Sequence, residues 1–306
     1  MEEMDFKFGI VPIVGRPNVG KSSLLNAILT YKVSIVSEKP QTTRNAIHGI
    51  YNEPGLQIVF TDTPGIHKPR HKLGEALVTA AIRSLENADL ILYVVEAEDS
   101  NLSPEDERIV DILKEVTTPI LLVINKADRV QESKKRLNKV ISIFQEMLPF
   151  AEVLGVSAKK GYNIERLVQT IKKRLPEGFP WYDEEVLTDS PERFLAGEII
   201  REKVLRLTHE EVPHSLAVEI EEYKSPDEYP ERDVLYIRAN LVVERDGQKT
   251  IIIGKKGRKI KEIGSYARAD LEKMTGHKVF LDLWVKVRPG WRQSESELRR
   301  MGYTGR

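Results

Sequence analysis

Residues 15–22 read GRPNVGKS, and they stand between the apolar run Phe8–Val14 and a helix-like stretch that ends in LLNAIL. This is the full G-x-x-x-x-G-K-[S/T] spacing of a phosphate loop. Two glycines allow a tight turn that aims backbone N–H groups at an anion near a helix N-terminus. A structural turn is the weaker alternative. The predicted nucleotide-binding residues of this stretch are Gly15, Arg16, Pro17, Asn18, Val19, Gly20, Lys21, Ser22 and Ser23.

The choice of base depends on a second motif, because a phosphate loop alone does not distinguish ATP from GTP. The apolar run PILLVIN leads into Asn125, Lys126, Ala127 and Asp128, an N-K-x-D pattern. Guanine offers two donors, at N1 and N2, to one carboxylate, whereas adenine would place an acceptor against the charge of Asp128. We expect Asn125 to serve the O6 and N7 edge and Lys126 to cover the base plane. Alone, the pattern also suits a turn after a buried strand, but behind a phosphate loop it indicates GTP.

Two more motifs follow strand-like runs, in the order that a GTP site needs. LQIVFT leads into Asp62, Thr63, Pro64 and Gly65, and AEVLGV leads into Ser157, Ala158 and Lys159. An acid such as Asp62 holds Mg²⁺ through water, and the N–H of Gly65 suits the γ-phosphate. We expect the N–H of Ala158 to reach guanine O6 and all seven residues to line the nucleotide.

The segment PQTTRN, residues 40–45, lies between these motifs. A threonine of a mobile loop completes the magnesium shell when GTP is bound. Thr42 and Thr43 both suit this role, and we choose Thr43 because it precedes Arg44, as in the related switch pattern TTR. The predicted metal ligands are therefore Ser22, Thr43 and, through water, Asp62. The predicted catalytic residues are Lys21, Thr43 and Gly65.

Taken together, GRPNVGKS, PQTTRN, DTPG, NKAD and SAK resemble the GTPase domain of the Era family, within the wider translation-associated GTPases. The motifs span residues 15–159. Relatives with two GTPase domains in tandem are excluded, because no second phosphate loop occurs. The resemblance implies a P-loop GTPase that hydrolyses GTP with Mg²⁺.

The residue after DTPG is Ile66, where Ras-type switches carry the glutamine that orients the attacking water. An aliphatic side chain cannot do this. Relatives in the Era class share the substitution, which implies slow intrinsic turnover and water positioned by the backbone, by another side chain or by a partner. Potassium-stimulated relatives also carry an asparagine where this chain has Asn18. Its side-chain carbonyl is a candidate ligand for K⁺, although a loop-stabilising hydrogen bond explains it equally well.

The composition limits the class of protein. A length of 306 residues suggests two domains, one of about 170 residues and one of about 100. No apolar run approaches the ~20 residues that span a bilayer, and the N-terminal MEEMDFKFG lacks the apolar core of a signal peptide. The chain has no cysteine, so disulfides and thiolate zinc sites are excluded. We expect a cytoplasmic protein without a transmembrane segment.

Residues 1–178 alternate apolar, β-branched runs with amphipathic stretches. This alternation predicts an α/β fold, a mostly parallel sheet with helices on both faces. NAIHGIY and LQIVF are separated only by NEPG, which predicts an antiparallel hairpin at one edge. Every nucleotide motif then falls at the carboxyl end of a strand. Residues 176–189, PEGFPWYDEEVLTD, lack periodicity, and we assign the linker to 179–190.

The pattern changes after the linker. It predicts a helix from PERFLAG with Ser190 as its N-cap, strands in SLAVEIEEY and DVLYIRANLVVE, a short apolar run, the sequence GKKG at 254–257, a long amphipathic helix and the strand KVFLDLWVKV. A lone GxxG suits an ordinary turn. The order of elements, however, resembles the KH domain found in Era, a smaller α+β domain of type II. In such domains the GxxG loop clamps about four single-stranded nucleotides. We assign 191–306 to this domain and its C-terminal tail.

Charge supports a nucleic-acid partner for the last part of the chain. The net charge is zero overall, but residues 249–292 carry 12 Lys or Arg and 4 Asp or Glu, whereas residues 181–248 carry 8 and 18. A polyanion would therefore bind the later segment. A solvated helix face paired with the acidic half is the weaker alternative. The predicted RNA-binding residues are Gly254, Lys255, Lys256, Gly257, Arg258 and Lys259.

Several other side chains allow two interpretations. Core packing is favoured over contact with bases for Ile251, Ile252, Ile253, Ile260 and Ile263. We expect Trp284 to be packed in its strand and Trp291, after Pro289 and Gly290, to be exposed. The six histidines show no metal-ligand spacing, and we expect His67 and His71 to be ordinary mobile-loop residues.

The resemblance covers nearly the whole chain and implies a GTP-hydrolysing switch coupled to single-stranded RNA binding. In that family the RNA lies near the 3′ end of small-subunit ribosomal RNA, and the role is assembly of the small ribosomal subunit. One alternative is an RNA-binding module gated by nucleotide, with incidental hydrolysis. Another is a peripheral protein of the inner membrane surface whose basic stretch binds anionic lipid.

Overall fold

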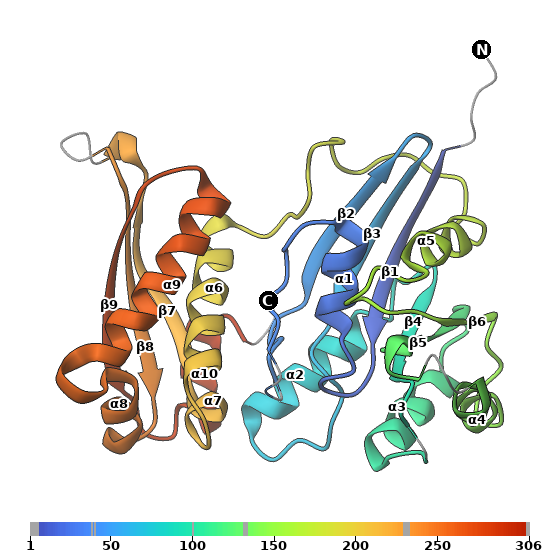
Figure 1. Ribbon diagram of the computed structural model, residues 1–306, viewed down its shortest axis with the longest axis horizontal. Helices are drawn as coiled ribbons and strands as arrows, with labels where there is room; N and C mark the ends of the chain where they lie inside the picture. Colours follow the sequence, from blue (N-terminus) through green and yellow to red (C-terminus); the bar gives the residue numbers. More distant parts are fainter. Residues whose placement is uncertain are drawn as a thin grey trace. The chain divides into compact units, whose positions relative to one another are not determined.

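The computed structural model describes residues 6–37, 39, 41–99, 101–130, 134–228 and 233–303. Residues 1–5 of the first predicted domain, Pro40 of the PQTTRN segment and residues 304–306 of the predicted tail lie outside this part. The chain forms two compact units, the first mainly up to Asp189 and the second mainly from Ser190 (Figure 1). In the described part of the chain, no helix is both long and apolar enough to cross a membrane.

The first unit contains a six-stranded sheet in the order β2-β3-β1-β4-β5-β6. Strand β2 is antiparallel to β3, and the other pairs are parallel, so the edge hairpin and the mostly parallel sheet are confirmed. Every residue of β5 is buried, as expected for a strand covered on both faces. The strands are β1 (Lys7–Val14), β2 (Ile47–Glu53), β3 (Leu56–Asp62), β4 (Ile91–Glu96), β5 (Ile120–Asn125) and β6 (Glu152–Gly155).

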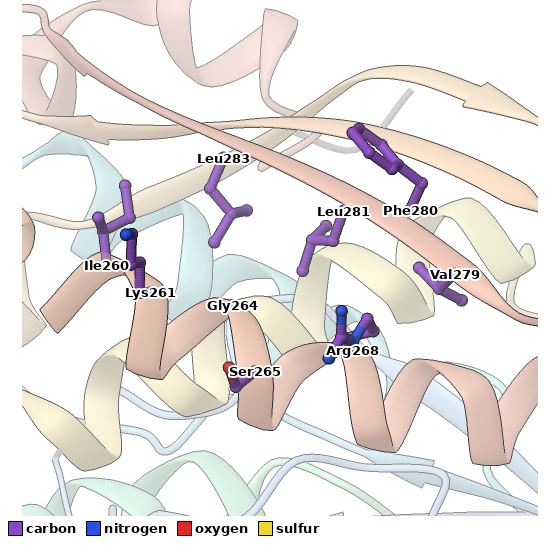
Figure 2. A pocket seen from close by; sticks show the side chains of 9 residues that line it. All are labelled: Ile260, Lys261, Gly264, Ser265, Arg268, Val279, Phe280, Leu281 and Leu283. Carbon is purple, nitrogen blue, oxygen red and sulfur yellow. The ribbon is translucent and has the colours of Figure 1, made fainter. Parts of the chain in front are cut away.

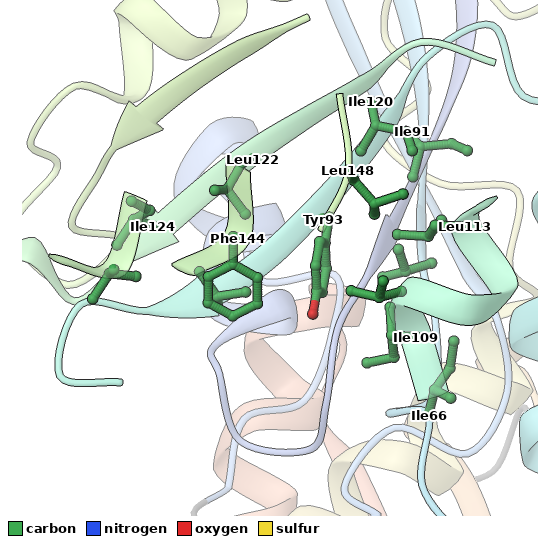
Figure 3. Packing of buried hydrophobic residues seen from close by; sticks show 14 of the residues in the cluster. Ile66, Ile91, Tyr93, Ile109, Leu113, Ile120, Leu122, Ile124, Phe144 and Leu148 are labelled. Carbon is green, nitrogen blue, oxygen red and sulfur yellow. The ribbon is translucent and has the colours of Figure 1, made fainter. Parts of the chain in front are cut away.

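Helices cover both faces of this sheet. On one face, α2, α3 and α4 pack their apolar sides around Tyr93, whose ring meets Phe144 edge-on at 5.6 Å between centroids (Figure 3). On the other face, α1 contacts α5, β2 and β3. Among the described residues of this unit, the α-helices are α1 (Lys21–Leu29), α2 (Lys72–Arg83), α3 (Pro104–Lys114), α4 (Lys134–Gln145) and α5 (Ile164–Lys172).

The segment assigned to the linker lies along the edge hairpin of the first unit. The N–H of Ile50 in β2 donates to Leu187 O at 2.9 Å, and the side chain of Gln57 bonds the backbone of Trp181 and Tyr182. The Trp181 ring lies 4.5 Å from that of Phe8. An edge strand exposes unpaired backbone groups, and this segment covers some of them.

The second unit has a three-stranded sheet in the order β7-β8-β9, with β7 antiparallel and β9 parallel to β8. Parallel neighbours need a long crossover, which here contains α8, the GKKG loop and α9. Helices α6 and α9 pack on one face of the sheet (Figure 1). The elements are α6 (Glu192–Leu207), α7 (Val212–Ser215), β7 (Ala217–Lys224), β8 (Leu235–Val243), α8 (Asp246–Ile253), α9 (Arg258–Thr275), β9 (Val279–Val287) and α10 (Glu295–Arg300).

Two local features differ from the sequence-based expectations. The apolar run before GKKG is helix α8, because the side chain of Gln248 accepts the N–H groups of Glu244 and Arg245 and so caps a helical turn. Ser190 is not the N-cap of α6, so this prediction was wrong. The cap position is Pro191, because the helical hydrogen bonds begin there: its carbonyl oxygen accepts the N–H groups of Phe194 and Leu195.

Both tryptophan predictions were wrong. Trp284 is 55% exposed, because helices cover only one face of the sheet and Trp284 alternates onto the other. Trp291 is fully buried: its Nε1 donates to Ser215 O at 2.9 Å and its ring stacks on Tyr303. Among the isoleucines, Ile252 and Ile263 are core residues as expected, whereas Ile251 is exposed.

The same substitution at these two positions should therefore destabilise the second unit to very different extents. Trp291→Ala leaves a cavity and an unpaired Ser215 carbonyl, and should destabilise the second unit by about 3–5 kcal/mol. Trp284→Ala, its matched control, should cost less than ~1 kcal/mol. Hydrogen exchange of peptides from α6 and α9, measured by mass spectrometry at increasing urea, gives both free energies. Equal losses would contradict the packing described here.

Candidate nucleotide site and nucleic-acid interface

The phosphate loop leaves β1 at Val14 and enters α1 at Lys21, in close contact with the two neighbouring strand ends. A Cβ on Gly15 would lie 2.4 Å from Val94 O, and one on Gly20, where φ is +97°, would lie 2.3 Å from Asn125 Nδ2. Both distances are too short for any side chain. The two motif glycines are therefore required by the packing of the loop against β4 and β5.

The motif lysine is buried under this loop. Lys21 Nζ donates to Gly15 O at 3.1 Å and to Arg16 O at 3.0 Å, while Ser23 follows in the first turn of α1. Burial, which disfavours the charged form, lowers the pKa of Lys21 to about 8. The loop carbonyls thus hold the ammonium group where the β- and γ-phosphates are expected.

The three predicted magnesium ligands meet at one point. Ser22 Oγ donates to Asp62 Oδ2 at 2.6 Å, and Thr43 Oγ1 lies 2.9 Å from Ser22 Oγ and 3.3 Å from Asp62 Oδ2. Sequence reasoning missed a fourth member, the buried Ser34, whose Oγ donates to Asp62 Oδ2 at 2.6 Å. No pattern marks Ser34, which lies in a loop without periodicity.

The chemistry of this cluster fits Mg²⁺. All its groups are oxygens, which hard cations prefer. Asp62 is fully buried, and this burial raises the pKa of its carboxyl group. Its Oδ1 is a buried atom without a hydrogen-bond partner in the described residues. A buried acceptor of this kind is costly unless a cation or water satisfies it.

The loop after β3 lies against the phosphate loop. A Cβ on Gly65 would be 2.7 Å from Pro17 N, and the N–H of Ile66 donates to Gly15 O at 3.3 Å. Upstream, Thr63 Oγ1 donates to Ile13 O, and Pro64 is buried. The Ile66 side chain is fully buried in the core with Ile109 (Figure 3). Ile66 therefore contributes only its backbone to the site.

The base motif is bonded to the phosphate loop and to the SAK turn. Asn125 Nδ2 donates to Val19 O at 2.9 Å, and its Oδ1 accepts the N–H of Ala158 at 3.1 Å. Lys126 Nζ donates to Asn18 O and to Glu96. Asp128 accepts a hydrogen bond from Ser157 Oγ at 2.5 Å, which lowers the pKa of Asp128 and keeps it ionised. Lys159 is exposed on the same turn.

A partly buried acidic network anchors the phosphate loop. Arg16 donates to Asp99, and its Nε lies 3.4 Å from Asp106 Oδ2. Asp106 is buried and accepts the hydroxyl groups of Tyr93 and Ser103. The sequence analysis did not assign these two acids, although Asp99 follows the strand-like run of β4. They fix the loop to β4 and α3.

In the second unit, the GKKG loop turns through positive φ angles at Gly254, Lys256 and Gly257. Lys255, Lys256 and Arg258 are exposed at the start of α9. Lys259 differs, because its Nζ donates to Leu207 O at 3.0 Å and its Cβ packs against Gly254. The loop therefore presents three cations beside a helix N-terminus, which favours anions.

A groove of about 420 Å³ lies beside this loop, between α9 and β9. Figure 2 shows Leu281 and Leu283 pointing from β9 toward Ile260 and Gly264 on α9, with Arg268 further along the helix. The sequence analysis did not assign three polar residues of this groove, Lys261, Ser265 and Arg268. Their spacing of three or four residues places them on one side of the helix, and this signal could have found them.

Each of the two units matches a known protein family. Residues 10–126 match the family of 50S ribosome-binding GTPases, and residues 211–292 match the KH domain. GTPase Era of Geobacter metallireducens is 47% identical over 304 residues, which cover 99% of this chain and 100% of that protein. This chain belongs to the Era family of GTPases. The Thermoanaerobacter sp. GTPase Era is 48% identical, with 98% and 97% covered.

Solved Era structures have the same fold. Era in complex with MgGDPNP and nucleotides 1506–1542 of 16S ribosomal RNA is 46% identical, with a TM-score of 0.93 over 98% of this chain and 100% of that one. Aquifex aeolicus Era bound to GDP and AlF₄⁻ is 45% identical, with the same TM-score and coverage. The predicted family, the fold class and the GTPase activity are confirmed. The roles of single site residues remain predictions.

The base contact can be tested by changing the nucleotide. Asp128→Asn should lower GTP affinity by tenfold or more, about 1.4 kcal/mol, and raise affinity for xanthosine triphosphate, because xanthine has a carbonyl to which the amide can donate. Competition against fluorescent GDP measures both affinities. Asp111→Asn, an exposed acid of α3, is the matched control. Unchanged preference for GTP in the Asp128 variant would rule out this contact.

Proposed function

We propose that this chain is an Era-type switch that binds GTP with Mg²⁺, hydrolyses it and couples the nucleotide state to single-stranded RNA binding. One observation supports this most strongly: the three predicted magnesium ligands meet below the phosphate loop in a chain that also carries an exposed GKKG loop. We further propose a role in small-subunit assembly, in the cytoplasm. The proposed boundaries are 1–178 for the GTPase domain, 179–190 for the linker and 191–306 for the KH domain.

In the proposed mechanism, Lys21 and the N–H groups of the phosphate loop hold the β- and γ-phosphates. Ser22, Thr43 and, through water, Asp62 would hold Mg²⁺, which when bound offsets the negative charge on the β- and γ-phosphate oxygens. Thr43 would contact the γ-phosphate through Mg²⁺, and Gly65 would contact it through its N–H. Loss of that phosphate removes their contacts, which gives the two loops a nucleotide-dependent state.

The proposed RNA site is the GKKG loop with its neighbouring groove. Lys255, Lys256 and Arg258 would position the phosphate backbone. The apolar groove would receive unstacked bases, and the Arg268 guanidinium offers donors at one end. The RNA in the similar Era complex is 16S ribosomal RNA, a small-subunit RNA, which supports the same target here. The description of the matching GTPase family refers to the 50S subunit, but that family model matches only residues 10–126.

The RNA site predicts a charge-dependent effect. Replacing both Lys255 and Lys256 by Asp should place negative charge along the RNA backbone and weaken binding by several kcal/mol. The slope of log affinity against log salt should fall by about 1.4, or ~0.7 for each lost contact. Fluorescence anisotropy measures this with single-stranded RNA from the 3′ end of small-subunit rRNA.

The matched control reverses the charge of two exposed lysines away from the loop, Lys273 in the last turn of α9 and Lys278 just before β9. Equal affinity and slope for the GKKG variant and the parent would show that RNA binds elsewhere. The basic segment 249–292 also suits anionic lipid at a membrane surface. Flotation with anionic vesicles, with and without RNA, tests that alternative.

Asn18 supports a proposal about K⁺. It adopts φ +69° beside the expected phosphates, and its backbone carbonyl oxygen accepts a hydrogen bond from Lys126 Nζ. Its side-chain oxygen would help ligate K⁺, which would add positive charge near the phosphates. GTP turnover at matched ionic strength should be faster in potassium than in sodium, and Asn18→Ala should remove the difference but retain binding. Equal rates in the parent protein would leave Asn18 with a loop-stabilising role only.

A further inference from the structure

Two side chains from the loops that carry Thr43 and Gly65 contact each other. Gln41 lies in the PQTTRN segment, and His67 lies in the loop after β3. Gln41 Nε2 and His67 Nε2 are 2.8 Å apart. His67, expected to be an ordinary mobile-loop residue, therefore has a defined partner.

The chemistry of the pair fixes which atom donates. The amide nitrogen of Gln41 can only donate, so Nε2 of His67 accepts and the neutral ring carries its proton on Nδ1. Burial lowers the pKa of His67, which agrees with the neutral form, while Glu105, Arg108 and Arg70 add smaller and opposing charge effects. In this arrangement Gln41 Oε1 remains an acceptor.

Gln41 Oε1 and His67 Nδ1 are both buried, and neither has a hydrogen-bond partner in the described residues. Gln41 also adopts φ +60°, a left-handed conformation that is unfavourable for a glutamine. Buried unsatisfied groups and strained residues are concentrated at functional sites.

The pair is close in sequence to both γ-phosphate loops. Gln41 precedes the magnesium-cluster residue Thr43 by two residues, and His67 follows Gly65 by two. Ile66, between Gly65 and His67 in the sequence, is fully buried in the core. The 2.8 Å hydrogen bond thus joins the two loops beside the one position where GTP hydrolysis needs a water-orienting group and Ile66 provides none.

We propose that Gln41 orients the attacking water through Oε1 and that His67 is the positioning residue that holds the Gln41 amide. This rests on the GTP placement proposed above. The water oxygen bonds to the γ-phosphorus as the bond from that phosphorus to the β,γ-bridging oxygen breaks. The electron pair leaves with GDP, and the water proton ends on inorganic phosphate. Neither side chain takes the proton.

Single-turnover hydrolysis with the full chain, preloaded with GTP and Mg²⁺, tests this inference. Gln41→Ala and His67→Ala should each slow hydrolysis roughly 10- to 100-fold, with GTP and GDP affinities within twofold of the parent. The double variant should be no slower than Gln41→Ala alone, because His67 acts through Gln41. His67→Gln, which keeps an acceptor for the Gln41 amide, should restore most of the rate.

His48, another partly exposed histidine of the first unit, provides the matched control, and His48→Ala should hydrolyse GTP at the parent rate. Hydrolysis within twofold of the parent in Gln41→Ala would overturn the inference. A parallel loss of nucleotide affinity would do so too, because it would indicate a structural role. Affinity of the parent for GTP tests the proposed function separately, and its absence would overturn both.

Discussion

The contact between the phosphate loop and the end of β5 is the constraint on which the first unit depends. Asn125 bonds the loop at Val19 O, and Gly20 passes so close to the Asn125 amide that no side chain fits there. This contact requires parallel β1, β4 and β5 to end at the same edge. It also explains why the base motif and the phosphate loop occur together, since each is part of the other's packing.

The same edge concentrates buried charge, which a protein core tolerates only when it is paired. Lys21 is held by loop carbonyls, Arg16 by two carboxylates, and Asp62 by three hydroxyl groups. Burial of these charges costs stability, and the hydrogen bonds offset that cost. The result is a site whose polar groups are positioned before a ligand arrives. Two buried oxygens without a hydrogen-bond partner in the described residues, Asp62 Oδ1 and Gln41 Oε1, lie where ligands are expected.

The second unit depends on a different constraint. Its parallel strands β8 and β9 cannot be joined by a tight turn, so the chain must cross over through α8 and α9. The sharp loop between those helices needs glycine at 254, where Lys259 packs closely, and it brings two exposed lysines to a helix N-terminus. The position of this loop is thus a consequence of sheet topology.

Sequence alone determined the nucleotide motifs and the two-part organisation. It also determined that GRPNVGKS, DTPG, NKAD and SAK lie at strand ends. These features depend on local spacing and periodicity. Tertiary structure decided what distant residues do to one another. The burial of Trp291, the exposure of Trp284, the role of Ser34 in the magnesium cluster and the pairing of Gln41 with His67 all depend on which face a neighbouring element covers. Periodicity describes a residue's own element but contains no information on the segments that pack against it.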